Sequence, residues 1–237
     1  MQIGVRDAAR LLRVSEKTIY RWLKDRRIPA CRINDHYRFN RAELLEWATS
    51  ERIAVSPSIF HEEGEDSEAP PASLHDALQA GGIFYRVGGA DKGSALREVA
   101  QLLRLPPEVD REYLLEVLLA RESLGSTAIG DGIAIPHVRN PIVMHIERPM
   151  ACLCFLERPV DFGALDGQPV GTLFTIISPT VRAHLRLLSQ LAYALRWPPF
   201  RAALSRQALR EEILSLCRVA ENPQARERAD AAEGEAA

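Results

Sequence analysis

His137 is the residue of this sequence whose setting best suits nucleophilic chemistry. It closes the run Gly125-Ser-Thr-Ala-Ile-Gly-Asp-Gly-Ile-Ala-Ile-Pro-His137, in which isoleucines alternate with small residues on either side of Gly130-Asp-Gly132. That pattern predicts a hairpin, because glycine tolerates the positive φ of a tight turn. Pro136 ends the second strand, since it has no N–H to give a ladder. We therefore expect His137 at a strand end with its imidazole facing solvent, although a plain hairpin that ends in histidine fits the spacing equally.

Motifs for nucleotide or acyl chemistry do not occur in the sequence. The stretch Gly88-Gly-Ala-Asp-Lys-Gly-Ser94 fails the spacing of a phosphate-binding G-x-x-x-x-G-K-[ST] loop. A G-x-S-x-G nucleophile elbow is also missing. Nothing in the sequence therefore suggests direct use of ATP; a phosphoprotein donor fits better, and we expect no cofactor and no nucleotide-dependent catalysis. A metal site between His137 and His184 lacks a third ligand at a recognisable spacing, so none is predicted.

A family resemblance gives the histidine a chemical role. The run Leu118-Leu-Ala-Arg-Glu-Ser-Leu-Gly-Ser-Thr-Ala-Ile-Gly-Asp-Gly-Ile-Ala-Ile-Pro-His-Val-Arg139 resembles the active-site segment of mannitol/fructose-type enzyme IIA domains of the bacterial phosphotransferase system. It is most similar to the nitrogen-regulatory branch. In that family the histidine after Ile-Pro accepts a phosphoryl group from a small histidine phosphocarrier protein. The resemblance implies that His137 is the phosphoacceptor; Ala128 and Val138 replace glycines common in the family without removing a reactive group.

The same resemblance implies groups that steady the phosphoryl oxygens. The family places an arginine, hydroxyls and a second histidine around the phosphoacceptor, as phosphoryl transfer requires. Arg121, Ser126, Thr127 and His184 match these positions. Each has an ordinary alternative: a surface arginine, two β-formers, and a core histidine on an apolar helix edge.

The N-terminal part of the chain is basic and helical. Residues 1–52 hold 12 Lys and Arg against 7 Asp and Glu, although the whole chain has a net charge of −2. Apolar spacing and turn signals predict three helices and a hairpin there. They are Arg6–Leu12, Glu16–Lys24 with Ser15 as N-cap, the hairpin Ala30–Asn40 with its turn at Asn34-Asp35, and Arg41–Ala48.

This part of the chain carries a second resemblance. Val5–Leu23, followed by Arg27-Ile-Pro-Ala30 and Tyr37-Arg-Phe39, is similar to the small winged helix-turn-helix of the excisionase and MerR-type family. The family implies that the second helix enters the major groove of duplex DNA and that the hairpin wing touches the backbone. Cationic and hydroxyl side chains suit contacts to phosphate and guanine. The implied DNA contacts are Ser15, Lys17, Thr18, Tyr20, Arg21 and, in the wing, Arg38. The alternative is a solvated basic face on a protein–protein module.

The segment after this module has the composition of a linker. Residues 53–72 contain five acidic and no basic residues, together with proline and serine, which predicts an acidic flexible linker. Solvation is its expected use, and competition with DNA for the basic module is the alternative.

The cysteines and the apolar runs bear on the compartment. Cys31, Cys152, Cys154 and Cys217 show no C-x-x-C spacing. Neither a signal peptide nor a run of membrane-spanning length occurs in the sequence. We expect a reducing cytoplasm and no membrane insertion.

From Ser73 onward, helical and strand patterns alternate, which predicts an α/β fold. The predicted helices are Ser73–Ala80, Asp91–Leu103, Asp110–Leu124, Ser178–Arg196 and Ala203–Cys217; the strands are Ile83–Val87, the hairpin, Pro149–Leu156 and Gly171–Ile177. We expect an enzyme IIA-like sandwich, a central mixed sheet flanked by helices, plus the small winged helix-turn-helix domain. The predicted domains are 1–52, the linker 53–72, the IIA domain 73–220 and a disordered tail 221–237.

Two functions fit these features. One is a regulator whose DNA binding follows phosphorylation of His137, with a histidine phosphocarrier protein, duplex DNA and a second copy of the chain as partners. The other is a phosphoryl carrier of a sugar system, whose N-terminal domain only tethers it or binds proteins. A pure interaction protein is a third, weaker alternative. In each case any catalysis is limited to a phosphohistidine intermediate.

Overall fold

The chain forms two structural units, Met1–Pro70 and Pro71–Ala237, each of which is described separately. The computed structural model describes residues 2–33, 36–40, 43–44, 47–48, 51, 53, 73–107, 109–138, 146–222 and 225–226. All but residue 53 of the predicted linker and most of the predicted tail lie outside the described residues.

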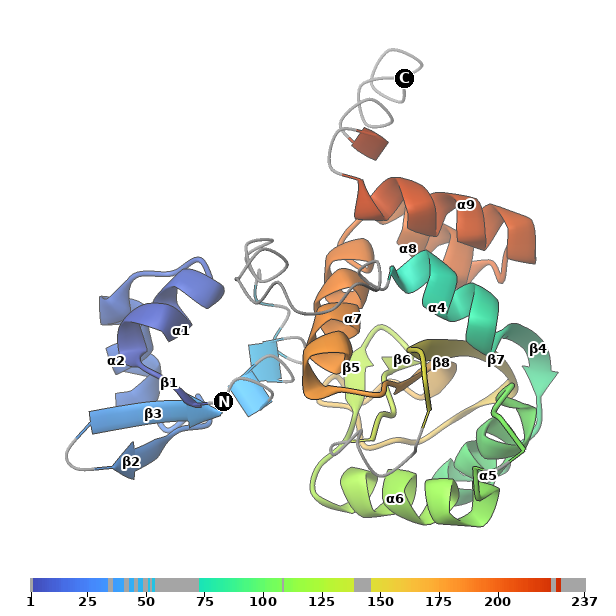
Figure 1. The fold of residues 1–237 in the computed structure, drawn as a ribbon, viewed down its shortest axis with the longest axis horizontal. Helices are drawn as coiled ribbons and strands as arrows, with labels where there is room; N and C mark the ends of the chain where they lie inside the picture. The colour runs from blue at the N-terminus through green and yellow to red at the C-terminus, as the bar shows by residue number, and fades with distance from the viewer. Residues whose placement is uncertain are drawn as a thin grey trace. The chain divides into compact units, whose positions relative to one another are not determined.

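The described residues of the first unit form two helices, α1 and α2, a small sheet and a helical segment that includes residues 43–44 and 47–48 (Figure 1). α1 (Val5–Leu11) and α2 (Glu16–Lys24) pack on a three-stranded antiparallel sheet in the order β1-β3-β2. The hairpin β2 (Cys31–Ile33) and β3 (His36–Asn40) was expected, whereas β1 (Gln2–Ile3) was not. A two-residue strand has no periodicity of its own, and its pairing with β3 defines it.

The second helix of this unit has the bounds that the sequence predicted. The Oγ of Ser15 accepts a hydrogen bond from the Thr18 N–H at 3.1 Å, which satisfies a donor that the first turn leaves unpaired. Ile19 is the fully buried residue of this helix. Of the expected third helix, residues 43–44 and 47–48 are helical, and the rest, like the turn Asn34-Asp35, lies outside the described residues. The rings of Trp22 and Trp47 meet edge to face at 5.2 Å and join the second helix to this segment.

The second unit is built on a five-stranded mixed sheet, as predicted, in the order β4-β7-β8-β6-β5. Its strands are β4 (Ile83–Val87), β5 (Ala128–Gly130), β6 (Ile133–Ala134), β7 (Met150–Val160) and β8 (Val170–Ile177). The pairs β4–β7 and β6–β8 are parallel, and β7–β8 and β5–β6 are antiparallel. The predicted hairpin is therefore the β5–β6 edge of the sheet.

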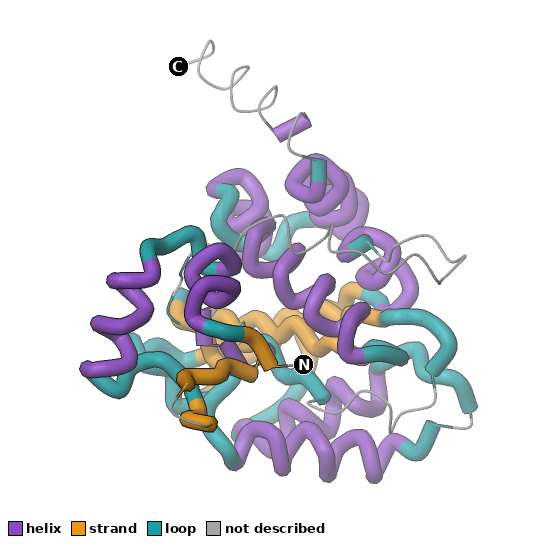
Figure 2. Tube along the Cα trace, turned by 60° about the vertical axis from the view of Figure 1, so that its left-hand side comes forward, coloured by secondary structure: helices purple, strands orange, loops and turns teal. Residues whose placement is uncertain are grey.

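Helices cover both faces of this sheet (Figures 1 and 2). One face carries α4 (Leu74–Gly81), α7 (Val181–Ala194), α8 (Pro198–Ser205) and α9 (Arg210–Glu221). The other carries α5 (Lys92–Leu102) and α6 (Arg111–Ser123). Two separate apolar cores result, because alternate residues of the central strands point to opposite faces. In β7, for example, Leu153 belongs to the first core and Cys154 to the second.

The predicted single helix Ala203–Cys217 is wrong, because the segment forms α8 and α9. α8 begins at Pro198 and Pro199, whose missing N–H groups cost nothing in a first turn that has no partners for them. The chain then turns at Gln207, which has a φ of 51°, before α9 starts at Arg210. The helix predicted before these prolines ends at Arg196, and the prolines themselves start the next helix.

Helix α4 ends against the central strand β7 through a glycine. A Cβ placed on Gly81 would overlap the backbone carbonyl of Ala151, so the close approach of helix and strand requires a residue without a side chain. Gly82 follows with a φ of 101° and ends the helix. The helix predicted over Ser73–Ala80 thus ends within a residue of the expected position, and the structure adds a packing role for Gly81.

Candidate functional site

His137 follows β6 and continues its direction. Its backbone forms an isolated parallel bridge with Ile176 of β8, so the residue lies at a strand end as expected. The Nδ1 atom is 2.7 Å from the carbonyl oxygen of Ile135. A carbonyl can only accept, so Nδ1 carries the proton and the lone pair of the neutral ring is on Nε2. The expectation that the ring faces solvent is wrong, because only 3% of His137 is exposed.

His184 lies beside His137, although 47 positions separate them in the sequence. It comes from the first turns of α7, which begins after β8, the strand that pairs with the His137 backbone. The two ring centroids are 5.1 Å apart, with an angle of 41° between the ring planes. His184 is 2% exposed, so it is a core residue and a neighbour of His137 at the same time. The sheet thus brings together the two histidines that the sequence paired by resemblance.

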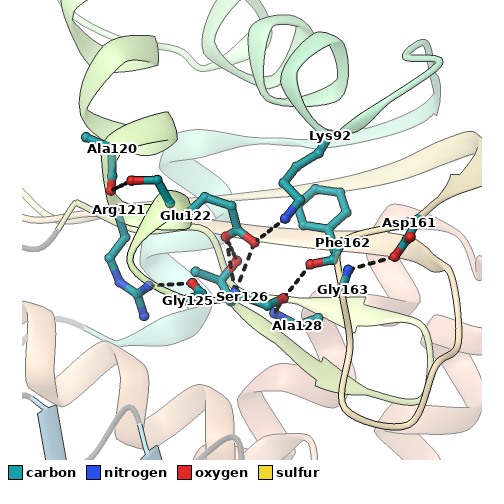
Figure 3. A network of polar contacts seen from close by, with 12 residues as sticks. Lys92, Ala120, Arg121, Glu122, Gly125, Ser126, Ala128, Asp161, Phe162 and Gly163 are labelled. Carbon is teal, nitrogen blue, oxygen red and sulfur yellow. Dashed lines mark hydrogen bonds and ion pairs between the residues drawn. The ribbon is translucent and has the colours of Figure 1, made fainter.

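Arg121 lies in the last turn of α6, and the two predicted hydroxyl residues, Ser126 and Thr127, lie in the loop between α6 and β5. The Nη1 of Arg121 donates to the carbonyl of Gly125 at 3.0 Å. The Ser126 hydroxyl donates to the Phe162 carbonyl at 2.6 Å and accepts from the Ala128 N–H at 3.1 Å. These bonds tie the loop to the segment after β7 (Figure 3). Ser126 therefore has a structural role here. That Arg121 and Ser126 contact the phosphoryl oxygens stays a prediction.

The hydroxyl of Thr127 is engaged by a residue that the sequence reasoning did not select. Thr127 Oγ1 donates to Oε2 of Glu122 at 2.6 Å, and Lys92 forms an ion pair with the same carboxylate at 3.2 Å. Figure 3 shows Lys92 and Glu122 reaching toward each other from α5 and α6. The position of Glu122 inside the matched segment, directly after Arg121, was the available signal. Thr127 also stays a predicted rather than a demonstrated phosphoryl contact.

The predicted DNA-contacting residues lie on one helix and one strand of the first unit. Ser15, Lys17, Tyr20 and Arg21 are exposed at and along α2, and Arg38 is exposed on β3. Thr18 is half-buried, and its hydroxyl lies 2.9 Å from the Ser15 Oγ. The rings of Tyr20 and Tyr37 meet edge to face at 6.4 Å and connect the helix with the hairpin. The arrangement presents cationic groups on α2 next to a wing strand.

The described part of the chain holds neither a metal-ligand cluster nor a membrane-spanning helix. Within those residues, no group of three or more His, Cys, Asp and Glu has the geometry of a metal site. None of the described helices has the length and apolar character needed to cross a bilayer.

The second unit matches a known protein family. The family described as phosphoenolpyruvate-dependent sugar phosphotransferase system, EIIA 2, matches residues 76–219. The chain belongs to the EIIA 2 family. A helix-turn-helix domain family matches residues 3–52, so the predicted fusion of an EIIA domain to a helix-turn-helix module is confirmed.

Relatives of the EIIA domain include nitrogen regulatory proteins. The one from Pseudomonas aeruginosa is 42% identical over 122 residues, which cover 50% of this chain and 77% of the relative. The one from Bradyrhizobium diazoefficiens is 38% identical over 107 residues, 44% of this chain and 68% of the relative. The solved structure of nitrogen regulatory protein IIA-Ntr from Neisseria meningitidis is 28% identical, with a TM-score of 0.54, and the match covers 61% of this chain and 98% of that one. The EIIA fold predicted from the sequence is confirmed.

Proposed function

We propose that this protein is a phosphotransferase-system-linked regulator. In this proposal a histidine phosphocarrier protein phosphorylates His137, and the phosphorylation state controls binding of duplex DNA by residues 1–52. The observation that carries the proposal is the His137 geometry: Nδ1 is bonded to the Ile135 carbonyl, which leaves the Nε2 lone pair as the nucleophile beside His184.

The proposed transfer needs only groups that the EIIA domain holds. The Nε2 of His137 attacks the phosphorus of the donor phosphohistidine, the donor P–N bond breaks, and the donor imidazole leaves with the electron pair. Positive charge develops on the His137 ring, and the hydrogen bond from Nδ1 to the Ile135 carbonyl stabilises it. His184 is close enough to contribute a ring N–H to the phosphoryl oxygens, and Arg121 is proposed as a second donor.

The helix-turn-helix module supports the regulator over the carrier. A sugar carrier gains little from a helix that exposes Lys17, Tyr20 and Arg21 beside a wing strand that exposes Arg38. Nitrogen regulatory proteins among the relatives favour a regulatory role as well. Because one small winged module makes few contacts, we propose that two copies bind DNA together. A cytoplasmic location completes the proposal.

Labelling of histidine variants tests the phosphoacceptor. The protein is incubated with the general phosphotransferase proteins and labelled phosphoenolpyruvate, and the label is tested for the acid lability of phosphohistidine. His137→Ala is expected to abolish labelling, whereas His145→Ala, which removes another histidine of the same unit, retains it. Equal labelling of His137→Ala and the unaltered protein would overturn the assignment.

A further inference from the structure

We infer that Glu122, paired with Lys92, is a positioning residue for His137: it fixes the backbone carbonyl that sets the orientation and tautomer of the imidazole. The inference deepens the proposed function and rests on it for the rate effect, but its geometric part concerns the unphosphorylated protein.

Glu122 is a buried carboxylate that accepts hydrogen bonds from Thr127 and forms an ion pair with Lys92. Its side chain is 3% exposed. The Thr127 N–H donates to both carboxylate oxygens, at 3.2 Å and 3.1 Å, and the Thr127 hydroxyl donates to Oε2 at 2.6 Å. A buried charge is costly unless it is paired and fully hydrogen-bonded, and Lys92 supplies the pairing at Oε1. Both oxygens of Glu122 are therefore used to hold Thr127.

Thr127 is connected to His137 through a single intervening residue. The Thr127 carbonyl accepts the Ile135 N–H at 3.0 Å, and the Ile135 carbonyl accepts the Nδ1–H of His137 at 2.7 Å. A displacement of Thr127 therefore weakens the hydrogen bond that holds the Ile135 N–H, and the Ile135 carbonyl, which selects the Nδ1–H tautomer, is then less firmly oriented although its neighbours stay paired with β8. Since the reactive nitrogen is the one without the proton, the orientation of this carbonyl determines whether Nε2 is available.

The hairpin has other anchors that do not depend on Glu122. The Gly132 carbonyl accepts from Gly171 N at 2.9 Å and from Thr172 N at 3.0 Å, which attaches the turn to β8. The His137 backbone is itself bridged to Ile176. The fold of the hairpin is thus held by β8, whereas the placement of Thr127 is held by Glu122. This separation distinguishes a positioning role from a general contribution to stability.

The variant Glu122→Gln tests the inference. An amide has one acceptor oxygen and one NH2 group, so it must direct a donor toward either the Lys92 ammonium or the Thr127 N–H. We expect ¹⁵N NMR of the His137 ring to change from the Nδ1–H tautomer to a mixture of tautomers. The rate of His137 phosphorylation at saturating donor should fall about ten- to a hundredfold, as for a small misplacement of a reacting group. The donor concentration for half-maximal rate should stay unchanged, because Glu122 is buried away from any docking partner.

A matched control is available in the same unit. The Oε1 of Glu221 accepts the N–H groups of Leu74 and His75 at the start of α4, so Glu221→Gln also replaces a carboxylate that binds backbone N–H groups. This variant should keep the His137 nitrogen shifts and the labelling rate. If Glu122→Gln lowers only the melting temperature and keeps both, Glu122 is merely structural and the inference is overturned. If the unaltered protein is not labelled at His137, the proposed function fails, and the nitrogen shifts of the two variants still decide the positioning role.

Discussion

His137 and Ile135 are two positions apart, and one hydrogen bond between them determines which ring nitrogen can react. The residue types and the hairpin pattern placed His137 correctly at a strand end, and its choice as the reactive residue came from the family resemblance. They did not predict its burial, because neighbouring elements rather than its own segment enclose the ring. The pairing with His184 came from family resemblance, since residues 47 positions apart share no periodicity. The role inferred for Glu122 could not be predicted from the sequence. Its carboxylate accepts hydrogen bonds from the N–H and the hydroxyl of Thr127, and no spacing rule marks such a contact.

The stability of the protein should depend on pH through another buried carboxylate, that of Glu221. Burial raises its pKa above the ordinary 4.5, and the N–H groups of Leu74 and His75 oppose this only in part. A raised pKa in the folded state means that its contribution to stability is present below the ordinary pKa and is lost as the pH rises through the folded value. The melting temperature of Glu221→Gln should therefore gain on that of the unaltered protein as the pH rises from about 4 to about 7. Thermal unfolding of both proteins across this range measures the difference, and parallel curves would contradict the shift.

At the scale of elements, local signals determined the helices well and their contacts poorly. The N-caps Ser15, Ser73, Asp91 and Asp110 each start a helix that the sequence had placed within a residue. The turn at Gln207 was missed, because a non-glycine residue with positive φ carries little sequence signal. β1 was missed because it exists only through pairing with β3.

The DNA binding predicted for helix α2 should depend on salt concentration. If it binds the DNA backbone, the logarithm of affinity should fall linearly with the logarithm of salt concentration, by about 0.9 for each phosphate neutralised. Arg21→Ala should weaken binding and reduce this slope by about one if Arg21 contacts a phosphate. Arg97→Ala removes the same charge from the exposed surface of α5 in the other unit and should leave the slope unchanged. Fluorescence anisotropy with a labelled duplex gives the slopes; a flat dependence would exclude DNA binding of this kind.

The close contact between α4 and β7 should make the stability of the domain sensitive to a side chain at Gly81. Gly81→Ala places a methyl group against the Ala151 carbonyl, and both are backbone-anchored, so the strand or the helix must move. We expect a loss of about 1–3 kcal/mol in the free energy of unfolding, as for overpacking of a core. Gly88→Ala is the control, because nothing lies within 4 Å of a Cβ at that position. Chemical denaturation of the two variants should show a lower midpoint for Gly81→Ala alone, and equal midpoints would refute the packing role.

At the scale of the whole chain, the joining of an EIIA domain to a helix-turn-helix module poses the question of coupling. Composition and charge predicted a boundary region between them, since the basic stretch ends where the acidic one begins. How the two units influence each other could not be predicted, because coupling depends on differences between states and not on the fold of either unit.

We predict that phosphorylation of His137 weakens DNA binding or changes the dimer state. The phosphoryl group adds negative charge, which opposes association with a polyanion. Coupling between sites typically changes affinity by about 5- to 150-fold, and DNA must then shift the phosphorylation equilibrium by the same factor. DNA titrations of the unmodified protein, the phosphorylated protein and His137→Ala at one salt concentration measure the coupling. Coincident curves would show that the units are only tethered, and the carrier function would replace the regulator.

The two cores on opposite faces of the EIIA sheet each contain their own cysteines. Cys152 and Cys154 belong to the core under α5 and α6, and Cys217 belongs to the core under α7, α8 and α9. The neighbouring Cys154 and burial raise the pKa of the Cys152 thiol, and burial raises that of Cys217. All three side chains are also buried, so reagents do not reach them in the closed protein. Alkylation of each thiol must therefore wait for its own face to open. The order in which the two groups of thiols are alkylated under native conditions therefore tells which helical layer detaches from the sheet first.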